Sequence, residues 1–246
     1  MPDKLYGLIG NNISYSFSKK YFTERFEKDN ALDCHYQNFD IANIEEFRDV
    51  VKNYPQLAGL NVTIPYKEAI CPYLDKISKK ATQIGAVNVI RFTKKGKLKG
   101  YNSDYYGFKK SLVALLQPHH KNALILGTGG ASKAVAFALA ALDIVFTFVS
   151  RENTENAIDY SRINATTLDN YQIIINCTPL GTSPYIEECP PIPYEYFTEN
   201  HIAYDLTYNP AETEFLKKAR KKGAITKNGL EMLVLQAERA WKIWNK

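Results

Sequence analysis

"NALILGTGGASKAVAFALAAL", residues 122–142, decides the fold of the second half of the chain. A continuous apolar run leads into a glycine-rich turn and then into an Ala-rich helical segment. Gly127 permits the tight turn, and Gly129 lets backbone N–H groups approach a pyrophosphate at the start of the helix. Ser132 stands where the G-x-G-x-x-G pattern has its third glycine. This context predicts a nucleotide site, and a plain tight turn is the alternative interpretation.

Three more apolar runs follow along the chain. Because they are almost continuously apolar, they predict strands of a parallel sheet that is covered on both faces. They are IVFTFVSR (144–151), YQIIINCTP (171–179) and HIAYDLTY (201–208). The first run ends at Arg151, where an NAD site usually places a carboxylate for the ribose 2′-hydroxyl. Arg151 favours a 2′-phosphate and therefore NADP, although Glu152 beside it would repel that phosphate. An exposed loop arginine is the alternative.

The first third of the chain alternates strand and helix patterns. It predicts strands at 4–10, 34–41 and 57–65, helices at 18–29 and 44–54, and a hairpin around Lys94-Lys95-Gly96. This alternation predicts a sheet with helical crossovers. The two halves are expected to meet around 104–118, with a ligand cleft between the two α/β units. The closing helix, 228–244, carries an apolar stripe.

A second informative stretch is NVTIPYK, residues 61–67. It begins with the β-branched residues of a strand. Pro65 then ends the ladder, and Lys67 follows where open α/β sheets place their ligands. A lysine that takes part in proton transfer must be held still and partly dried, so Lys67 is a candidate catalytic residue. A structural salt bridge is the alternative.

Composition and charge narrow the class of protein. The chain has 246 residues, of which 45% are hydrophobic and 23% charged, with a net charge of +5. These values predict a globular protein that binds a small anionic ligand, and neither nucleic acid nor a membrane. The four cysteines form no metal-spaced or C-x-x-C cluster, so no metal site is expected. Free thiols and the absence of a secretory signal at the start predict a cytoplasmic location.

A series of motifs, taken in order, resembles the shikimate dehydrogenase family from about residue 5 to residue 244: NVTIPYK, GAVN, GYNSD, GTGGAS, NCTPLGT, YDLTYNP and GLEMLVLQ. This family reduces 3-dehydroshikimate to shikimate with NADPH, in aromatic amino acid (chorismate) biosynthesis. The resemblance implies an α/β fold with a substrate domain at 1–104 and a Rossmann-like, doubly wound NADP domain at 105–228. It also implies that a C-terminal helix, 229–246, returns to the substrate domain.

The resemblance implies a role for each matching residue. Lys67 and Asp104 are the implied catalytic pair, with Ser103 where the family has threonine. The implied substrate-binding residues are Ser16, Ser18, Thr63, Asn88, Tyr208 and Gln236. The implied cofactor-binding residues are Gly127, Gly129, Gly130, Ala131, Ser150, Arg151, Thr178 and Gly229. We expect the catalytic and substrate residues on one wall of a cleft, and the glycine turn with Arg151 on the other.

The N-terminal loop departs most from the family pattern. Asn12, Tyr15 and Lys19 replace a proline, a histidine and a second proline, a change that bears on loop rigidity and substrate preference. Ser16 and Ser18 remain, and two hydroxyl donors two residues apart can reach one carboxylate. A helix N-cap at Ser18 is compatible with that role.

Three functions compete at this stage. The first is an NADP-dependent shikimate dehydrogenase, and the second is a relative that also accepts quinate or prefers NAD. The third is a dinucleotide-binding sensor without catalysis. Retention of both Lys67 and Asp104 argues against the sensor, because a sensor needs no proton-transfer pair. The oligomeric state is left open between monomer and homodimer.

Overall fold

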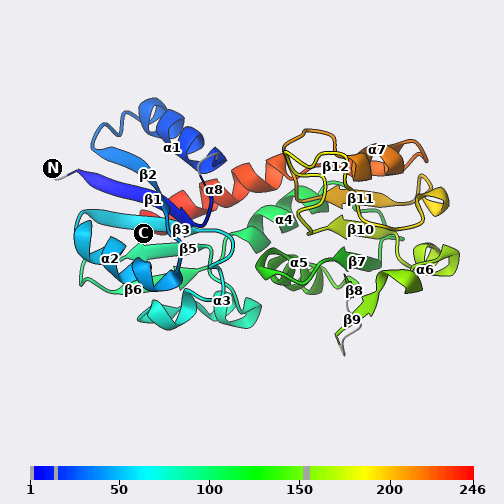
Figure 1. Ribbon diagram of the computed structural model, residues 1–246, viewed down its shortest axis with the longest axis horizontal. Helices are drawn as coiled ribbons and strands as arrows, with labels where there is room; N and C mark the ends of the chain where they lie inside the picture. The colour runs from blue at the N-terminus through cyan, green and yellow to red at the C-terminus, as the bar shows by residue number, and fades with distance from the viewer. Residues whose placement is uncertain (1–2, 14–15, 152–155) are drawn as a thin grey trace. The chain divides into compact units, whose positions relative to one another are not determined.

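The computed structural model describes residues 3–13, 16–151 and 156–246 (Figure 1). Tyr15 and Glu152, which the sequence singled out, lie outside the described residues. The chain forms two compact units. The first comprises Met1–Ser103 with Ala237–Lys246, and the second comprises Asp104–Gln236. Both units are α/β, as the sequence predicted. Within the described ranges, no helix is long and apolar enough to cross a membrane.

The first unit is built on a mixed sheet with the strand order β2-β1-β3-β5-β6-β4. Its strands are β1 (Lys4–Gly10), β2 (Cys34–Asp40), β3 (Leu57–Val62), β4 (Lys76–Ile77), β5 (Val89–Phe92) and β6 (Leu98–Tyr101). Its helices are α1 (Phe17–Lys28), α2 (Phe47–Asn53) and α3 (Lys79–Ile84), with the end of α8 (Leu230–Trp244). β1, β2 and β3 pair in parallel, whereas β5 runs antiparallel to β3 and β6.

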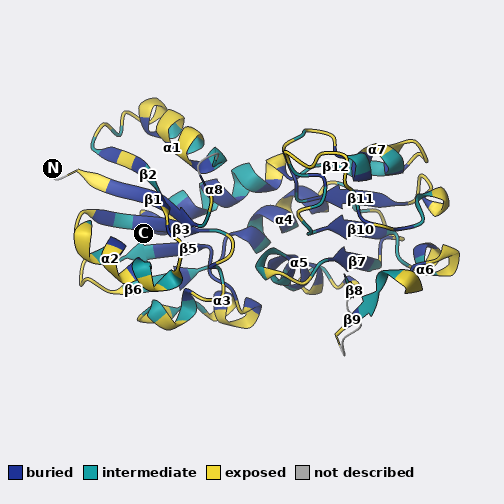
Figure 2. Cartoon of the chain, viewed as in Figure 1, coloured by how far each residue is buried: buried dark blue, intermediate teal, exposed yellow. Residues whose placement is uncertain are grey.

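Helices cover both faces of this sheet. One face packs against α1 and α8, through a cluster that includes Phe22, Phe26 and Trp244. The other face packs against α2, α3 and the segment after β3, through a cluster that includes Phe47 and Ile70. Figure 2 shows buried residues along the strands and exposed residues on the outer sides of the helices. The alternation of apolar residues in the first third of the chain corresponds to these two clusters.

One strand is shorter than the sequence predicted. β3 ends at Val62, although 57–65 was expected to be extended. The Thr63 N–H still donates to the carbonyl of Ile9 at 2.9 Å. The chain then turns, and the Tyr66 N–H donates to the carbonyl of Thr63 at 2.9 Å. Proline has no N–H to donate, so the ladder cannot continue through Pro65. The β-branched residues alone therefore overestimated the length of the strand.

The second unit holds a parallel sheet with the strand order β12-β11-β10-β7-β8-β9. Its strands are β7 (Asn122–Leu126), β8 (Val145–Ser150), β9 (Ala157–Asp159), β10 (Ile173–Asn176), β11 (Ile202–Asp205) and β12 (Ile225–Lys227). Its helices are α4 (Asp104–Val113), α5 (Gly130–Ala140), α6 (Ala165–Asn170), α7 (Glu214–Arg220) and the first part of α8. The chain leaves β7 toward β8 and later returns to its other side at β10. This reversal of strand order is the switch point of a doubly wound sheet, as predicted.

Two apolar clusters lie on the two faces of the second sheet. α4, α5 and Met232 of α8 contribute to one, and α6 and α7 contribute to the other. The central strands β7 and β10 are almost wholly buried between these clusters. Their continuous apolar runs reflect this burial on both faces. α8 continues without a break past Gln236, so its last residues belong to the first unit, where the sequence expected the final helix.

Two buried histidines precede strands at the amino-terminal edge of the second sheet. The His120 ring accepts a hydrogen bond from the Gln117 N–H at Nδ1, 2.9 Å, so its Nε2–H donates to the carbonyl of Asn200 at 3.0 Å. His201 likewise accepts from the Thr198 N–H at 3.0 Å. The bond to Nδ1 holds the His120 ring in the neutral form.

We expect the stability of the protein to fall in acid partly through His120. Burial lowers the pKa of His120, the neighbouring rings of His119 and His201 add to this, and the bond to Asn200 acts in the opposite direction. A depressed folded-state pKa gives stability that is complete above the unfolded value of about 6.5 and is lost as the pH falls through the folded value. In urea unfolding at several pH values, His120→Gln should weaken the pH dependence. The same change at the exposed His35 is the control, and an equal slope in wild type and His120→Gln would contradict the prediction.

Candidate active site

The first unit gathers its polar residues at one edge of the sheet. β1 and β3 end at this edge, and β5 begins there because it runs antiparallel to β3. β6 ends at the same edge, because it is antiparallel to β5. The described residues that follow or precede these strand ends are 11–13, Ser16, 63–67, Asn88 and 102–103. Segments far apart in the sequence therefore meet at one edge.

A network of buried amides holds this edge together. The Asn88 side chain accepts from the Ser103 N–H at 2.6 Å and donates to the Ser103 hydroxyl at 3.0 Å. The Asn102 amide donates to the carbonyl of Ala86 at 3.0 Å. Asn88, Asn102 and Ser103 are buried, so these bonds lie away from competing water. The network fixes the end of β6, and Asp104 follows it directly as the first residue of α4.

Lys67 is carried by a firmly anchored turn. The Tyr66 hydroxyl donates to the carbonyl of Ile41 at 2.9 Å, and Ile70 is fully buried. The carbonyl of Lys67 itself accepts from the Val87 N–H at 2.7 Å, beside Asn88. The backbone of Lys67 is therefore fixed between two buried side chains, while its own side chain is only half-buried. This arrangement is what a held and partly dried amine requires.

The N-terminal loop is braced by a carboxylate. Asn12 has φ 54°, in the left-handed region that asparagine tolerates and proline cannot adopt. Asp40 at the end of β2 accepts from the backbone N–H groups of Asn12 at 2.8 Å and Ile13 at 3.1 Å. The Asn38 amide donates to the carbonyl of Ile13 at 3.1 Å. The loop that departs from the family pattern is thus held by side chains of the neighbouring strand.

The two serines lie at the start of α1. Ser16, and not Ser18, is the N-cap, because its hydroxyl accepts from the Ser18 N–H at 3.1 Å. Ser18 is buried and lies within hydrogen-bonding reach of the Tyr36 hydroxyl. The capping alternative for Ser18 is therefore wrong, since a cap precedes the first turn and Ser18 lies inside it.

Tyr36 is a site residue that the sequence reasoning missed. Burial raises its pKa, against the lowering effect of the Ser18 hydroxyl. Its own hydroxyl donates to the side chain of Asn61 at 2.9 Å, and the Asn61 amide reaches the carbonyl of Asn88 at 3.4 Å. Tyr36 thus joins Ser18, at the start of α1, to the network of buried amides. The only signal in the sequence was a tyrosine at an inward position of a strand, which serves equally as core.

The second unit gathers its polar residues at the carboxyl ends of its parallel strands. Short segments leave β7, β8, β10, β11 and β12 on this side, beginning at Gly127, Arg151, Cys177, Leu206 and Asn228. In doubly wound sheets this edge, at the switch point, is where ligands bind. The cofactor residues implied by the resemblance lie on these segments, at the start of α5 or, for Ser150, at the last position of β8.

The glycine turn has the geometry that a phosphate site needs. Gly127 has φ 103°, and a Cβ there would come within 3.2 Å of the Thr178 side chain. Of the described atoms, none lies within 4 Å of the place that a Gly129 Cβ would take, so the backbone at the start of α5 is open. Ser132 is fully buried and donates to the carbonyl of Gly129 at 2.6 Å, which explains why a small residue replaces the third glycine. The helix start thus offers N–H groups to an anion.

A buried carboxylate, Asp205 at the end of β11, connects the end of β10 to the segment between β11 and α7. It accepts from the Asn176 amide at 3.1 Å, from the Thr207 N–H at 2.9 Å and from the Thr213 hydroxyl at 2.6 Å. Burial raises its pKa, and these hydrogen bonds act in the opposite direction. Asn176 in turn accepts from the N–H and the hydroxyl of Thr178. Asp205, which sequence reasoning did not single out, therefore positions Thr178, a candidate cofactor-binding residue, through Asn176.

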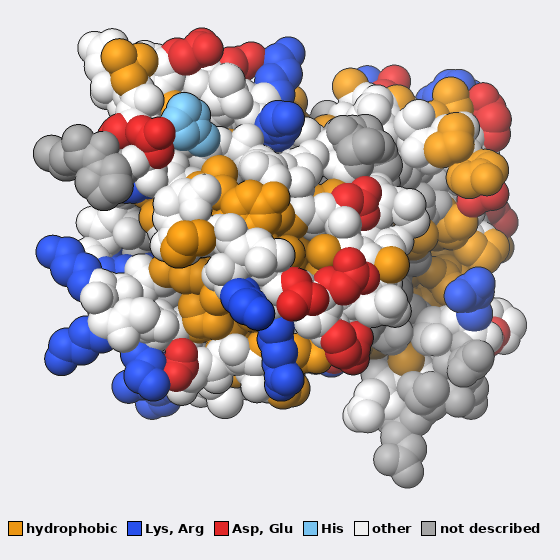
Figure 3. All heavy atoms as spheres, turned by 60° about the vertical axis from the view of Figure 1, so that its left-hand side comes forward, with side chains coloured by type: hydrophobic (Ala, Val, Ile, Leu, Met, Phe, Trp, Pro, Cys, Tyr) orange, Lys and Arg blue, Asp and Glu red, His pale blue; other side chains and the backbone are white. Residues whose placement is uncertain are grey.

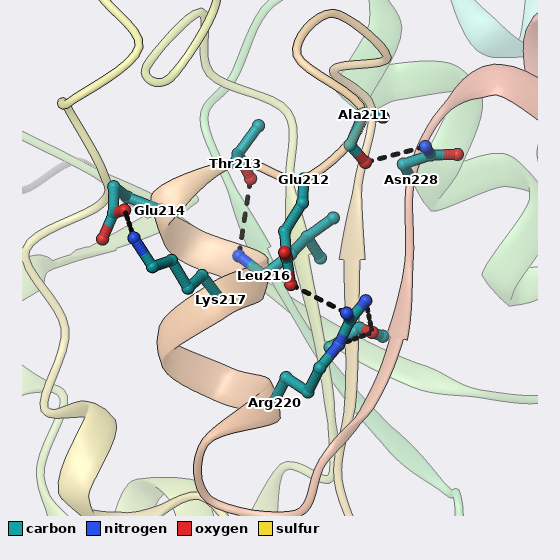
Figure 4. A network of polar contacts seen from close by, with 9 residues as sticks. Ala211, Glu212, Thr213, Glu214, Leu216, Lys217, Arg220 and Asn228 are labelled. Carbon is teal, nitrogen blue, oxygen red and sulfur yellow. Dashed lines mark hydrogen bonds and ion pairs between the residues drawn. The ribbon is translucent and has the colours of Figure 1, made fainter.

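Polar contacts around α7 secure the neighbouring segments (Figure 4). Thr213 caps α7 by accepting from the Leu216 N–H at 3.4 Å, and Arg220 pairs with Glu212 at 2.9 Å. The Asn228 amide donates to the carbonyl of Ala211 at 2.9 Å, which fixes the residue before Gly229.

Gly229 lies against the backbone of Leu206, in the loop that follows β11. A Cβ there would come within 2.1 Å of the carbonyl of Leu206, so this position admits only glycine without a shift of the backbone. Seven residues further along α8, Gln236 is buried and its amide donates to the carbonyl of Leu233 at 2.9 Å. Asp104, Tyr208 and Gln236 belong to the second unit, so their grouping with Lys67 stays a prediction.

The guanidinium of Arg151 places a positive charge directly after β8. Arg151 is exposed and lies close to Tyr160. Burial raises the pKa of Tyr160 to about 12, while the guanidinium of Arg151 lowers it. On the face of the described residues drawn in Figure 3, lysine and arginine side chains stand singly or in small groups between acidic and uncharged ones.

Comparison with known proteins gives consistent results. A family model described as the shikimate dehydrogenase substrate binding domain matches residues 8–90. A shikimate dehydrogenase (NADP(+)) of Methanococcus maripaludis is 40% identical, over 98% of this chain and 91% of its own length.

Two solved structures share the fold over nearly the whole chain. Shikimate dehydrogenase from Aquifex aeolicus is 34% identical, with a TM-score of 0.88 over 99% of this chain and 92% of that one. The Thermus thermophilus shikimate 5-dehydrogenase, solved with NADP(H) and shikimate, is 30% identical, with a TM-score of 0.86 over 98% of this chain and 93% of that one.

Proposed function

The chain belongs to the shikimate dehydrogenase family, and we propose that it catalyses the reversible, NADPH-dependent reduction of 3-dehydroshikimate to shikimate in aromatic amino acid biosynthesis. The relatives that support this proposal match along nearly the whole chain, so both the substrate and the cofactor unit are represented. The observation that carries it is that each unit gathers its polar residues at one edge of its own sheet. The edge of the first sheet holds Lys67, Ser16 and Ser18. The edge of the second sheet holds the open backbone at the start of α5.

The substrate carboxylate is proposed to bind at the start of α1. Ser16 and Ser18 supply hydroxyl donors there, and the N-terminus of a helix favours an anion. The ring hydroxyls of the substrate would bind Thr63 and Asn88, with Tyr208 and Gln236 as further contacts. Tyr36 and Asn61 support this proposal, because they hold Ser18 and Asn88 in a common network.

Lys67 and Asp104 are proposed to manage the proton of the reacting hydroxyl. During reduction the ketone oxygen needs a donor, and the Lys67 ammonium provides the proton. During oxidation the Lys67 amine accepts the hydroxyl proton, while Asp104 hydrogen-bonds the same hydroxyl and orients the lysine. The two groups act as a coupled pair. The anchored turn of Lys67 supports this role, because a general acid must reach the reacting oxygen without a search.

The residues of the second unit fit NADP(H). The open backbone at Gly129, with Gly130 and Ala131 in the first turn of α5, would hold the pyrophosphate. Ser150 and Arg151 would hold the 2′-phosphate, Thr178 would line the site, and Gly229 would bring its backbone to the nicotinamide. When bound, NADP(H) supplies or accepts the hydride at the carbinol carbon.

A kinetic survey tests the proposal. The purified protein is assayed with shikimate and with quinate, each with NADP⁺ and with NAD⁺. We expect the largest kcat/KM for shikimate with NADP⁺. A larger value with quinate or with NAD⁺ would favour the second candidate of the sequence reasoning, and binding without turnover would favour the sensor. The proposed location is the cytoplasm, and light scattering would distinguish monomer from homodimer.

A further inference from the structure

We infer that Glu238 of α8 is a positioning residue for substrate binding, acting on the first turn of α1 through Tyr21 and Arg25. The part of this inference that concerns substrate binding rests on the proposed function. The three residues lie within the first unit.

One carboxylate oxygen of Glu238 receives two hydrogen bonds from α1. The Tyr21 hydroxyl and a terminal nitrogen of Arg25 both donate to Glu238 Oε1. The Arg25 Nε also donates to Asp29 at 2.6 Å, which fixes the guanidinium. The side chains of Arg25 and Glu238 are 25% and 31% exposed, so water screens the pair only partly. Charge-assisted bonds of this kind are the stronger and more directional ones in proteins.

The electrostatics keep this cluster in one protonation state. Burial and, after it, the bond to Glu238 raise the pKa of Tyr21 to about 12, against the lowering effect of Arg25. Burial would raise the pKa of Glu238, but the bonds from Tyr21 and Arg25 outweigh it and lower that pKa. A neutral phenol and a charged carboxylate therefore persist at neutral pH.

The cluster lies on the same side of α1 as Ser18, which is a proposed substrate-binding residue. Tyr21 and Arg25 follow Ser18 by three and seven residues, which places all three on one side of the helix. The Tyr21 ring also stacks on Phe17, the first residue of α1, with ring centroids 5.4 Å apart. Fixing Tyr21 thus fixes the turn in which the Ser18 hydroxyl is presented.

Apolar packing alone does not set this turn. Phe22 and Phe26 hold α1 against α8 through ring contacts with Trp244 and Trp241, at 5.1 and 5.4 Å between centroids. Burial of apolar surface is non-directional, so it permits a small rotation or slide of the helix. Hydrogen bonds to one carboxylate oxygen resist such a movement, because they weaken steeply as the donor–hydrogen–acceptor angle departs from linear. Removing them should therefore leave α1 folded while displacing its first turn.

Glu238→Gln is the main test, with Glu24→Gln as the matched control. Both changes remove one negative charge, so any general attraction of an anionic substrate changes equally. Glu24 lies on α1, in a largely exposed pair with Lys20, 3.9 Å apart. For Glu238→Gln we expect the KM for shikimate to rise about 5- to 10-fold with kcat within about 2-fold, because a small misplacement of a binding group weakens binding. The control should keep both constants.

A second variant and a second measurement separate the possible results. Tyr21→Phe removes only the hydroxyl, and combined with Glu238→Gln it should add little, since both break one cluster. Amide hydrogen exchange at Ser18, whose N–H is bonded to the Ser16 hydroxyl in the first turn of α1, should be at least about 3-fold faster in both variants than in Glu24→Gln.

Unchanged exchange in both variants would overturn the positioning of α1, whether or not the protein oxidises shikimate. Faster exchange with an unchanged KM would overturn the role in substrate binding. An inactive wild type would instead refute the proposed function, while the exchange comparison would still decide whether Glu238 positions α1.

Discussion

Lys67→Ala is expected to lower kcat for shikimate oxidation by about 10²–10⁴-fold, the usual range for loss of a general acid–base group. The proton of the reacting hydroxyl is transferred in the transition state, so the loss should fall on kcat. The KM for shikimate should change far less, because the proposed carboxylate contacts at Ser16 and Ser18 remain. The circular dichroism spectrum should be unchanged, since the Lys67 side chain is only half-buried and the turn is anchored by Tyr66 and Ile70.

The control for this prediction is Lys95→Ala, at the exposed tip between β5 and β6. It removes the same charge from the same unit and should leave both constants unchanged. Near-normal kcat with a greatly raised KM in Lys67→Ala would redefine Lys67 as a binding residue. The catalytic role would then pass to Asp104 or to a water that it holds.

Arg151→Ala should raise the KM for NADP⁺ by about 10- to 150-fold and leave the KM for NAD⁺ little changed. One charge-assisted bond to the 2′-phosphate contributes about 1.5–3 kcal/mol, which corresponds to this range. Arg151 is exposed at the end of β8, so its loss should not disturb the core. Steady-state kinetics with both cofactors measures the difference directly.

Arg162→Ala is the matched control for Arg151, because it removes an exposed arginine from a neighbouring segment of the same unit. We expect it to preserve the preference for NADP⁺. If Arg151→Ala weakened both cofactors equally, Arg151 would support the fold or the shared part of the cofactor, and the preference for NADP⁺ would need another source.

Local chemistry in the sequence predicted the order of the elements and the family. The glycine turn at 127–132 needs only a tight turn with an open backbone, and these are properties of the residues themselves. The continuous apolar runs predicted the buried parallel strands for the same reason, since burial on both faces leaves no polar alternation to read. Lys67 was found because Pro65 interrupts the strand just before it.

The supports of the site depended on tertiary structure. Tyr36, Asn61 and Asn88 meet only because β2, β3 and β5 belong to one sheet, and Asp205 joins the end of β10 to the segment between β11 and α7. The antiparallel direction of β5 is also invisible to periodicity, which is the same for both directions of a strand. A buried polar group is satisfied by whichever partner the fold brings near, often many residues away. The sequence by itself therefore determined which groups are proposed to do the chemistry, and the tertiary structure decided what holds them in place.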